Sequence, residues 1–346
     1  MVRPSLLFAL LLLLVPGATG FGPPTLGSDP FSSRVGASDL AALRTMPALP
    51  GSVRAVGAVV LDAESSHVLV SRNADVRLAP ASLTKMMTAL VALDQAPLPE
   101  TIRATERSLS EPTVIGLDPG ETLSLEHMLY GLMLNSGNDA ALAIAETIGG
   151  GSIERFVALM NERAQAMGLK NTRFANPNGL DQAGHYSSAR DMAEMARAVM
   201  AEPSLARIVG TRRFVVEGPP PYVFFNSNPL LGSYEGLDGV KTGFTDDAGS
   251  CLAATAVRNG RRLVSVVLNS SGIAAETIAL LDMGFASAQA RVIDVPRPGF
   301  AGVRDLGPSS VGRETVLAGW EVPFLRAFSA GGRTTVSLAG RRLIEW

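Results

Sequence analysis

The order of strand-like and helical segments constrains the fold of this chain more than any other feature. Apolar, β-branched runs at 54–61 and 68–71 enclose a short acidic turn and predict a β-hairpin. Helical patterns then extend over 82–200, strand-like runs return from about 212, and a helix is predicted at 275–288. Because strands lie at both ends with helices between them, we expect an α+β domain whose antiparallel sheet is built from both ends of the segment.

The finer pattern divides this outline into elements. Apolar residues at a 3.6-residue period predict helices from Ser82, over 124–134, 140–148 and 152–167, and from Ser187 to Met200. The residues 168–186 form a long predicted loop, and such loops inside compact domains are usually functional. Strands are predicted at 213–217, 222–226, 239–245, 252–257 and 262–268, the last two joined by an Asn-Gly hairpin turn at 259–260.

The chain has 346 residues, of which 47% are hydrophobic, and this suggests one large domain with a smaller one. We predict a signal peptide at 1–20, a linker rich in Gly, Pro and Ser at 21–50, the large domain at 51–289 and a small β-rich segment at 290–346. We find no internal repeat.

The N-terminus has the pattern of an export signal. Arg3 is followed by an apolar run over 6–15 and by small residues at 16–20. The run is shorter than the roughly 20 residues that a membrane-spanning helix needs, so we expect cleavage in preference to a retained anchor. The last residues, 341–346, follow a stretch broken by glycines and do not resemble an amphipathic anchor. We therefore predict an exported, periplasmic protein with at most a loose membrane association.

Several classes of function are disfavoured. A net charge of −2 gives no reason to expect a nucleic acid or an anionic membrane surface as partner. The single cysteine, Cys251, lies in an apolar strand-like run and is predicted to be a small core residue. The three histidines, His67, His127 and His185, do not have the spacing of metal ligands, so we expect no metal and no cofactor.

Lysine is scarce in this chain. Of 30 basic residues only Lys85, Lys170 and Lys241 are lysines. An arginine-biased genome would explain the scarcity, but not why two of the three lysines lie in short motifs. Lysine can lose its proton in a protein when burial or neighbouring charge lowers its pKa, whereas arginine cannot. This favours a role for a titratable amine at those two positions.

The first motif is Ser82-Leu83-Thr84-Lys85. Residues three apart at the start of a helix share a face, so the Lys85 amine can reach the Ser82 hydroxyl. A serine needs a base to act as a nucleophile, and a neutral lysine can be that base, with Lys241 as a second cation that lowers its pKa. Alone, the motif is weak, because a capping serine and a surface lysine would give the same spacing.

Two further triplets strengthen the case. Ser136-Gly137-Asn138 lies between two predicted helices and could supply a proton relay and an orienting amide, or be an ordinary capping turn. Lys241-Thr242-Gly243 lies on a predicted strand, where glycine would allow close approach and threonine could hydrogen-bond a carboxylate, or it could be an edge strand beside a turn.

Together the three motifs are a known catalytic set of β-lactamases and penicillin-binding proteins. From about Val53 to Ala288 the chain resembles the low-molecular-mass penicillin-binding proteins of the serine D-alanyl-D-alanine carboxypeptidase family. The resemblance extends to the segments 79–85, 135–140, 176–180, 186–191 and 239–245. It implies a β-lactamase/DD-peptidase-like fold, with an antiparallel sheet packed against helices and a helical subdomain.

The resemblance also implies a mechanism. Ser82 would attack the D-Ala-D-Ala bond at the end of a peptidoglycan stem peptide, and Lys85 would take its proton. Ser136 would relay a proton to the departing D-alanine, while Asn138 and Lys241 hold charge and orientation. In the segment 241–244, Lys241, Thr242 and Gly243 would bind substrate, and the backbone N–H groups of Ser82 and Phe244 would form the oxyanion hole. Penicillin and other β-lactams would acylate Ser82.

Some features depart from the family pattern and leave alternatives open. Many members carry an arginine near the substrate carboxylate, but the segment 269–277 contains none. A D,D-endopeptidase acting on cross-links therefore stays a possible variant. A class A β-lactamase would need a glutamate that activates water, and no Glu-x-x-Leu-Asn segment follows Ser136. A non-catalytic β-lactam or peptidoglycan sensor would need no nucleophile, which disfavours that reading.

Overall fold

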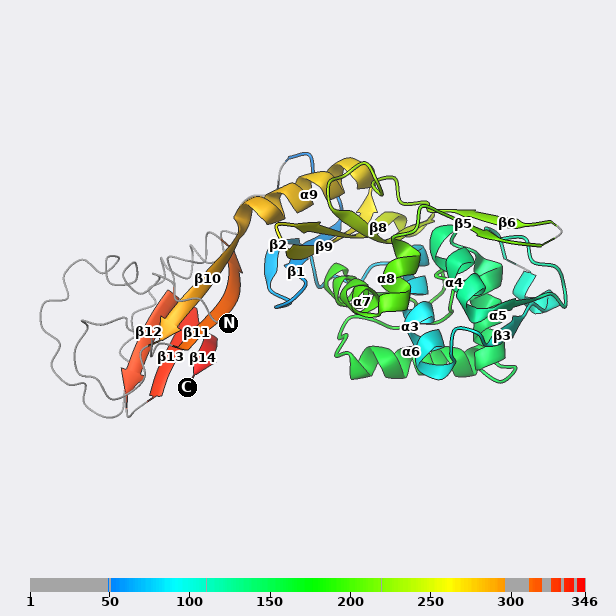
Figure 1. Cartoon of the computed structure of the whole chain (residues 1–346), viewed down its shortest axis with the longest axis horizontal. Coiled ribbons are helices and arrows are strands. Elements are labelled where there is room, and N and C mark those ends of the chain that lie inside the picture. Colours follow the sequence, from blue (N-terminus) through cyan, green and yellow to red (C-terminus); the bar gives the residue numbers. More distant parts are fainter. Residues whose placement is uncertain are drawn as a thin grey trace, which may run out of the picture. The chain divides into compact units, whose positions relative to one another are not determined.

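The computed structural model describes residues 49, 51–109, 111–218, 220–295, 311–318, 325–330, 333–338 and 341–345. Its contacts define a unit at Leu49–Phe285 and a second unit that includes Ala286–Trp346 (Figure 1). The predicted signal peptide at 1–20 lies outside the described residues, as does the linker at 21–50 apart from Leu49. Among the described residues, no helix has both the length and the apolar character needed to cross a membrane.

A five-stranded antiparallel sheet forms the centre of the first unit. Its order is β2-β1-β9-β8-β7, so strands from the two ends of the unit pair in the middle, where Val59 of β1 faces Val266 of β9. Both the predicted N-terminal hairpin and the sheet built from two ends are confirmed. The strands are β1 (Gly57–Asp62), β2 (Val68–Arg72), β7 (Leu237–Thr245), β8 (Gly249–Arg258) and β9 (Arg261–Ser270).

The turn between β8 and β9 shows why these two strands pair. Asn259 and Gly260 have φ values of 52° and 75°, and two consecutive positive φ values are what a tight hairpin turn requires. Residues with small or amide side chains tolerate this backbone, so the predicted Asn-Gly turn forms. The flanking strands are apolar on both faces because helices cover both sides of the sheet.

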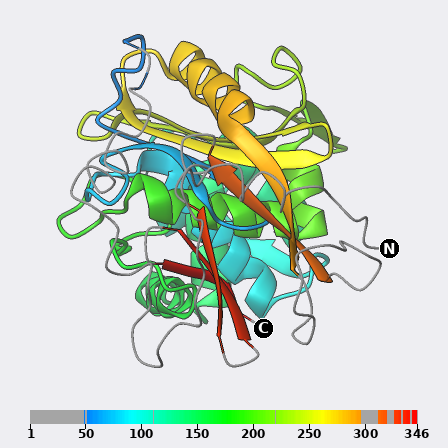
Figure 2. The ribbon, with the colours of Figure 1, turned by 90° about the vertical axis from the view of Figure 1, so that its left-hand side faces the viewer.

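Helix α9 (Ile273–Ser287) covers one face of the sheet (Figure 2). Its approach depends on Gly284, where an added Cβ would lie 2.7 Å from the Val60 side chain on β1. The carboxylate of Glu276, only 3% exposed, accepts a hydrogen bond of 2.8 Å from the backbone N–H of Ala55. This bond fastens the start of α9 to the chain that leads into β1.

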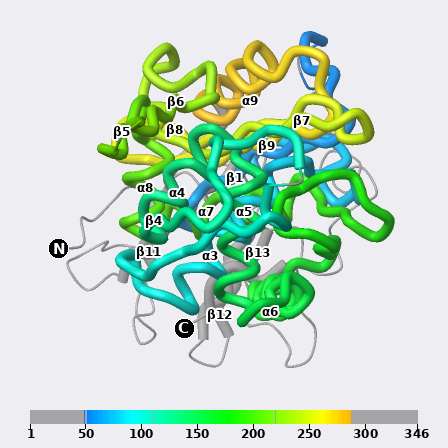
Figure 3. The backbone as a smooth tube through the Cα atoms, turned by 90° about the vertical axis from the view of Figure 1, so that its right-hand side faces the viewer, coloured from blue at the N-terminus to red at the C-terminus, as the bar shows by residue number. Residues whose placement is uncertain are grey.

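The other face carries the helical part of the unit, which appears below the sheet in Figure 3. Its main core residues are leucines, methionines and alanines that repeat along the buried helix faces. The helices at Ser82, 124–134, 140–148, 152–167 and 187–200 were all predicted, with ends shifted by a few residues. They are α3 (Lys85–Gln95), α4 (Leu125–Leu134), α5 (Asn138–Ile148), α6 (Ile153–Ala166) and α7 (Ala189–Ala201).

Several short elements were not predicted from the sequence. Helix α8 (Pro203–Val209) begins with proline at its first turn, and the Glu202 carboxylate caps it by accepting the Ser204 N–H. Two small ribbons also flank the helices. One pairs β3 (Thr101–Arg103) with β4 (Thr122–Ser124), which was not predicted, and the other pairs the predicted strands β5 (Arg213–Val216) and β6 (Tyr222–Phe225).

From Ala288 onward, the described residues of the C-terminal unit lie in strands. Strand β10 (Ala288–Val295) pairs with β11 (Val311–Ala318), and β12 (Leu325–Ala330), β13 (Arg333–Leu338) and β14 (Arg341–Glu345) form an antiparallel meander. The predicted division into a domain at 51–289 and a segment at 290–346 stays a proposal.

Candidate active site

Ser82 and Lys85 lie at the junction of a short 3-10 helix, η1 (Ala81–Thr84), with α3. The single turn brings Lys85 Nζ to 2.8 Å from Ser82 Oγ. The preceding Ala81 has a φ of 49°, a left-handed conformation that is uncommon for a residue with a side chain. The chain thus turns sharply just before Ser82, and the predicted contact between the serine hydroxyl and the lysine amine is present.

The Lys85 amine is fully buried and has three oxygen neighbours. Besides Ser82 Oγ, it contacts Asn138 Oδ1 at 2.7 Å and the Asn178 carbonyl oxygen at 2.6 Å. Burial lowers the pKa of Lys85 well below its ordinary value, and the charge of Lys241 lowers it further, while Asp139 acts in the opposite direction. The environment therefore favours the neutral amine.

Asn138 is the first residue of α5, and the preceding turn fixes its side chain. Its backbone N–H donates to the Thr113 carbonyl at 2.8 Å, and Nδ2 donates to the Pro112 carbonyl. Because Nδ2 is used in that way, Oδ1 must be the atom that faces Lys85. Ser136 lies in the same turn with a φ of 63°, and among the described residues its hydroxyl has no hydrogen bond to Ser82 or Lys85.

The Asn178 carbonyl comes from the long loop 168–186, which the sequence analysis singled out without assigning this contact. A second bond holds the loop to α3, where Thr88 Oγ1 donates to the Pro177 carbonyl at 2.5 Å. Gly179 passes so close to the nucleophile turn that an added Cβ would lie 2.0 Å from the Ala81 carbonyl oxygen. With its φ of +91°, only glycine fits here without displacement of the backbone.

The Lys-Thr-Gly motif lies on β7, the strand at one end of the sheet order. An added Cβ at Gly243 would lie 2.9 Å from the backbone nitrogen of Ser82, so the glycine lets β7 pass directly beside the nucleophile. Lys241 is buried, and its Nζ donates to the Thr242 carbonyl at 2.9 Å. Burial lowers the pKa of Lys241 to about 7. Phe244 lies two residues beyond Thr242 and is 66% exposed.

Two contacts on β7 were not anticipated. Ser227 Oγ lies 2.6 Å from Thr242 Oγ1, which makes a pair of neighbouring hydroxyls at the residue that follows Lys241. Farther along, Thr245 Oγ1 donates to the Asp181 carboxylate at 2.7 Å and joins β7 to the long loop. The isolated hydroxyls and carboxylate gave no sequence pattern, since their partners lie 15 and 64 residues away.

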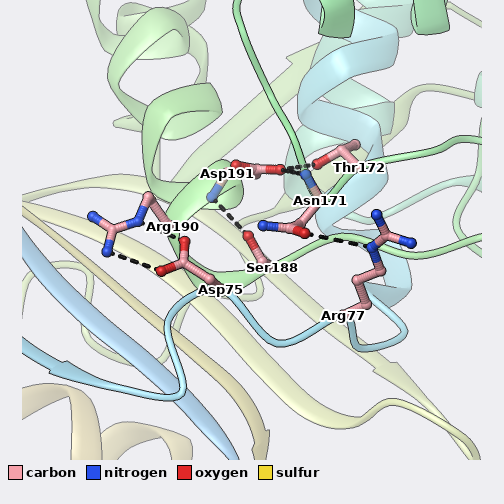
Figure 4. A network of polar contacts seen from close by, with 7 residues as sticks. All are labelled: Asp75, Arg77, Asn171, Thr172, Ser188, Arg190 and Asp191. Atoms are coloured by element: carbon pink, nitrogen blue, oxygen red, sulfur yellow. Dashed lines mark hydrogen bonds and ion pairs between the residues drawn. The ribbon is translucent and has the colours of Figure 1, made fainter.

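A polar network anchors the start of the long loop to α7 (Figure 4). The Asp191 carboxylate accepts bonds from the Asn171 backbone N–H at 2.7 Å and from Thr172 Oγ1 at 2.8 Å. Ser188 caps the same helix by accepting the Asp191 N–H. Nearby, Arg190 forms a two-pronged ion pair with Asp75 on the segment after β2. The segment 186–191, quoted above for its resemblance, therefore holds the loop that supplies the Asn178 carbonyl.

Cys251 is buried in β8, and burial raises the pKa of its thiol to about 11, so it stays an uncharged core residue as predicted. Within the part of the chain that the structure describes, no three His, Cys, Asp or Glu side chains gather as a potential metal site. The structure thus brings Ser82, Lys85 and Asn138 into direct contact and sets Gly243 against Ser82.

Comparison with known proteins identifies the family. Residues 44–272 match the family model described as D-alanyl-D-alanine carboxypeptidase. The chain is 42% identical over 225 residues to D-alanyl-D-alanine carboxypeptidase DacF of Bacillus subtilis, covering 63% of this chain and 58% of that protein. It is 38% identical over 272 residues to DacA of Escherichia coli, covering 74% and 66%. The match thus spans less than two thirds of the length of either relative.

Solved structures agree on the fold. The structure of D-alanyl-D-alanine carboxypeptidase DacD from Francisella tularensis superposes with a TM-score of 0.72 at 25% identity, covering 85% of this chain and 92% of that one. The Streptomyces K15 DD-transpeptidase superposes with a TM-score of 0.64 at 31% identity, covering 68% and 98%. The protein belongs to the D-alanyl-D-alanine carboxypeptidase family and has the penicillin-binding DD-peptidase fold, so both predictions are confirmed.

Proposed function

We propose that this protein is a serine D-alanyl-D-alanine carboxypeptidase that removes the terminal D-alanine from peptidoglycan stem peptides. The observation that carries the proposal is the contact of 2.8 Å between the buried Lys85 amine and the Ser82 hydroxyl. Relatives at 42% and 38% identity bear the same activity in their names. We further propose that the protein is exported by its N-terminal signal and acts in the periplasm.

The hydrogen-bond partners of Lys85 support its role as base. The Asn138 Oδ1 and the Asn178 carbonyl oxygen can only accept hydrogen bonds. A neutral amine has two hydrogens and one lone pair, so its hydrogens go to these two acceptors. The lone pair is then left to face Ser82 Oγ, and it can accept the hydroxyl proton as the oxygen attacks the substrate carbonyl.

The remaining residues take the roles that the family resemblance suggests. The oxyanion formed by the attack would accept hydrogen bonds from the backbone N–H groups of Ser82 and Phe244. Ser136 would pass the proton that Lys85 has taken from Ser82 to the departing D-alanine. The charge of Lys241 would keep the resting Lys85 amine neutral by lowering its pKa. Water would then hydrolyse the ester on Ser82 and regenerate the enzyme.

Carboxylate recognition has a specific candidate in this chain. The hydroxyls of Ser227 and Thr242 lie 2.6 Å apart, at the residue that follows Lys241. One hydroxyl donates to the other, and the remaining hydrogen can be donated to a substrate carboxylate. This pair would act where many family members have an arginine, because the segment 269–277 has none. An endopeptidase would not need to bind a free terminal carboxylate, so substrate preference tests this assignment.

The proposal is tested with two substrates. The purified protein is incubated with penicillin and, separately, with a stem pentapeptide, and intact mass and released D-alanine are measured. We expect a stable adduct on Ser82 and stoichiometric release of D-alanine. Absence of an adduct contradicts the acyl-enzyme mechanism, and rapid turnover of penicillin indicates a β-lactamase. An adduct without D-alanine release favours an endopeptidase or a sensor.

A further inference from the structure

A buried histidine contacts the turn that carries Ser82. His185, at the end of the long loop, is 7% exposed, and its Nε2 lies 2.8 Å from Oγ1 of Thr84. Thr84 is fully buried and sits between Ser82 and Lys85 in the sequence. The ring therefore reaches a polar residue of the motif to which the proposed mechanism gives no role.

The other ring nitrogen fixes the protonation state. The Ala175 backbone N–H donates to His185 Nδ1 at 3.0 Å, so Nδ1 must carry a lone pair. The proton of the neutral ring is then on Nε2, which donates to the Thr84 hydroxyl. The ring also packs edge-on against Phe174, with centroids 5.8 Å apart. One imidazole thus joins the loop backbone at 174–175 to the turn that carries the nucleophile.

The same stretch of loop leads directly to the Lys85 contact. Only two residues separate Ala175 from Asn178, whose carbonyl accepts the Lys85 amine at 2.6 Å. Asn161 on α6 also holds Phe174, since its side chain exchanges two hydrogen bonds of 2.9 Å with the backbone of that residue. The loop is therefore fixed on the side of α6, and His185 links that fixed point to Thr84.

We propose that His185 is a positioning residue for the acylation of Ser82, holding Thr84 and the Asn178 carbonyl in register about Lys85; this rests on the function proposed above. The ring nitrogens of His185 contact Thr84 and Ala175, not the reacting groups of Ser82 and Lys85. It acts by fixing the distance between two segments whose relative position decides where the Lys85 lone pair points. A displacement of about 1 Å in such a site can cost about a hundredfold in rate.

Two substitutions test the hydrogen bonds of Nδ1 and Nε2 separately. His185→Asn keeps an acceptor near the position of Nδ1, and His185→Gln keeps a donor near the position of Nε2, so each retains one of the two bonds. We expect either change to slow penicillin acylation by about tenfold or more per folded molecule, because a single bond does not fix the register. Thr84→Val, which removes only the hydroxyl, should slow acylation similarly.

The test measures the second-order acylation rate against pH, together with thermal unfolding, in the full chain. If His185 positions the site, the pH at which the acylation rate rises should shift in the His185 variants, because the surroundings of Lys85 change. A positioning role also predicts that Thr84→Val combined with His185→Asn loses no more than the stronger single change. The matched control is His67→Asn, at the end of the sheet opposite Gly243, which should leave the rate unchanged.

The outcomes separate this inference from the proposed function. If the wild-type protein is not acylated, the proposed function fails. If it is acylated and the His185 variants melt earlier but keep the wild-type rate and pH profile, His185 is only structural and the positioning role is overturned. Additive losses in the double variant would likewise contradict a shared pathway through Thr84. If His185→Asn does not fold, His185→Gln and Thr84→Val decide the same question.

Discussion

Two loops each fix one oxygen beside Lys85, and they do so in different ways. The loop around 111–117 works through a side chain, since it binds the amide of Asn138 and turns Oδ1 toward the amine. The long loop 168–186 works through its backbone, since it delivers the carbonyl of Asn178. The two contacts are almost equal in length, at 2.7 and 2.6 Å.

A buried carboxylate fastens each loop. Asp139 accepts the backbone N–H groups of Ile115, Gly116 and Leu117, and Asp191 accepts Asn171 and Thr172 at the start of the second loop. The two contacts with Lys85 differ in the residue types that they allow. The first contact needs an amide at one position, whereas any residue can supply a carbonyl, so the second contact depends on the path of the chain.

The largest expected effect concerns the group on which both loops converge. Lys85→Arg replaces the neutral amine with a permanent cation that can still contact both oxygens but has no lone pair to accept a proton, so acylation by penicillin should fall about 10³-fold or more. Intact mass after timed exposure measures the effect, and circular dichroism checks the fold. Lys170→Arg, at an exposed position, is the matched control. Acylation of Lys85→Arg at the wild-type rate would rule out Lys85 as the base.

The second prediction tests whether the close approach of Gly179 to Ala81 constrains the path of the long loop. Gly179→Ala adds a Cβ that would lie 2.0 Å from the Ala81 carbonyl oxygen at a φ of +91°, and we expect a loss of about 3 kcal/mol in unfolding free energy. Gly168→Ala has a similar φ of +72° with no atom nearby, and should cost only about 1 kcal/mol. Chemical denaturation compares the two. Equal losses would mean that the close approach at Gly179 does not constrain the loop.

The third prediction contrasts the two contacts directly. Asn138→Ala removes the oxygen that faces Lys85 and should slow acylation about a hundredfold. Asn178→Ala leaves its carbonyl in place and loses only the side-chain bond to the Leu180 N–H, so its rate should stay within about threefold of wild type. Rates are taken on folded protein after melting temperatures are compared. A large loss in Asn178→Ala would show that its side chain also takes part.

The smallest expected effect is a pH dependence of stability that arises from His185 in the long loop. Burial lowers the pKa of His185 to about 4, against an ordinary value of 6.5, with Asp181 acting to raise it. Below pH 6.5 the unfolded chain therefore binds a proton that the folded protein does not, and stability falls as pH drops toward 4. Between pH 7 and pH 5 this amounts to about 2 kcal/mol. Urea denaturation of wild type and His185→Asn at both pH values measures it, since the variant should lack this part of the loss.

The parts of the fold that follow from periodic patterns were predictable. The hairpin at 54–71, the five main helices and the Asn-Gly turn at 259–260 were all expected, because each has a local signature. Helix α8 was missed because seven residues are too few to show a helical period, although the Glu202-Pro203 start was a usable signal. Strands β3 and β4 have three residues each and leave no pattern.

In the candidate site, too, residues in local motifs were predictable and contacts between distant residues were not. Ser82, Lys85 and Asn138 were predicted as side chains within recognisable triplets, and the structure brings them together. The Asn178 carbonyl was not assigned because a backbone acceptor has no residue signature, and only the glycine that follows it marks the unusual path. His185 and Ser227 were missed as site neighbours, since their partners lie 101 and 15 residues away in the sequence.

The scarcity of lysine has a practical consequence for spectroscopy. Lys85 and Lys241 are buried, whereas Lys170 is exposed, so the side-chain amines occupy three distinct environments. Isotope labelling of lysine alone would give an NMR spectrum with one signal for each amine. Lys170 would serve as an internal reference, and the titration of the two buried amines could be followed without mutation, because arginine supplies the rest of the positive charge.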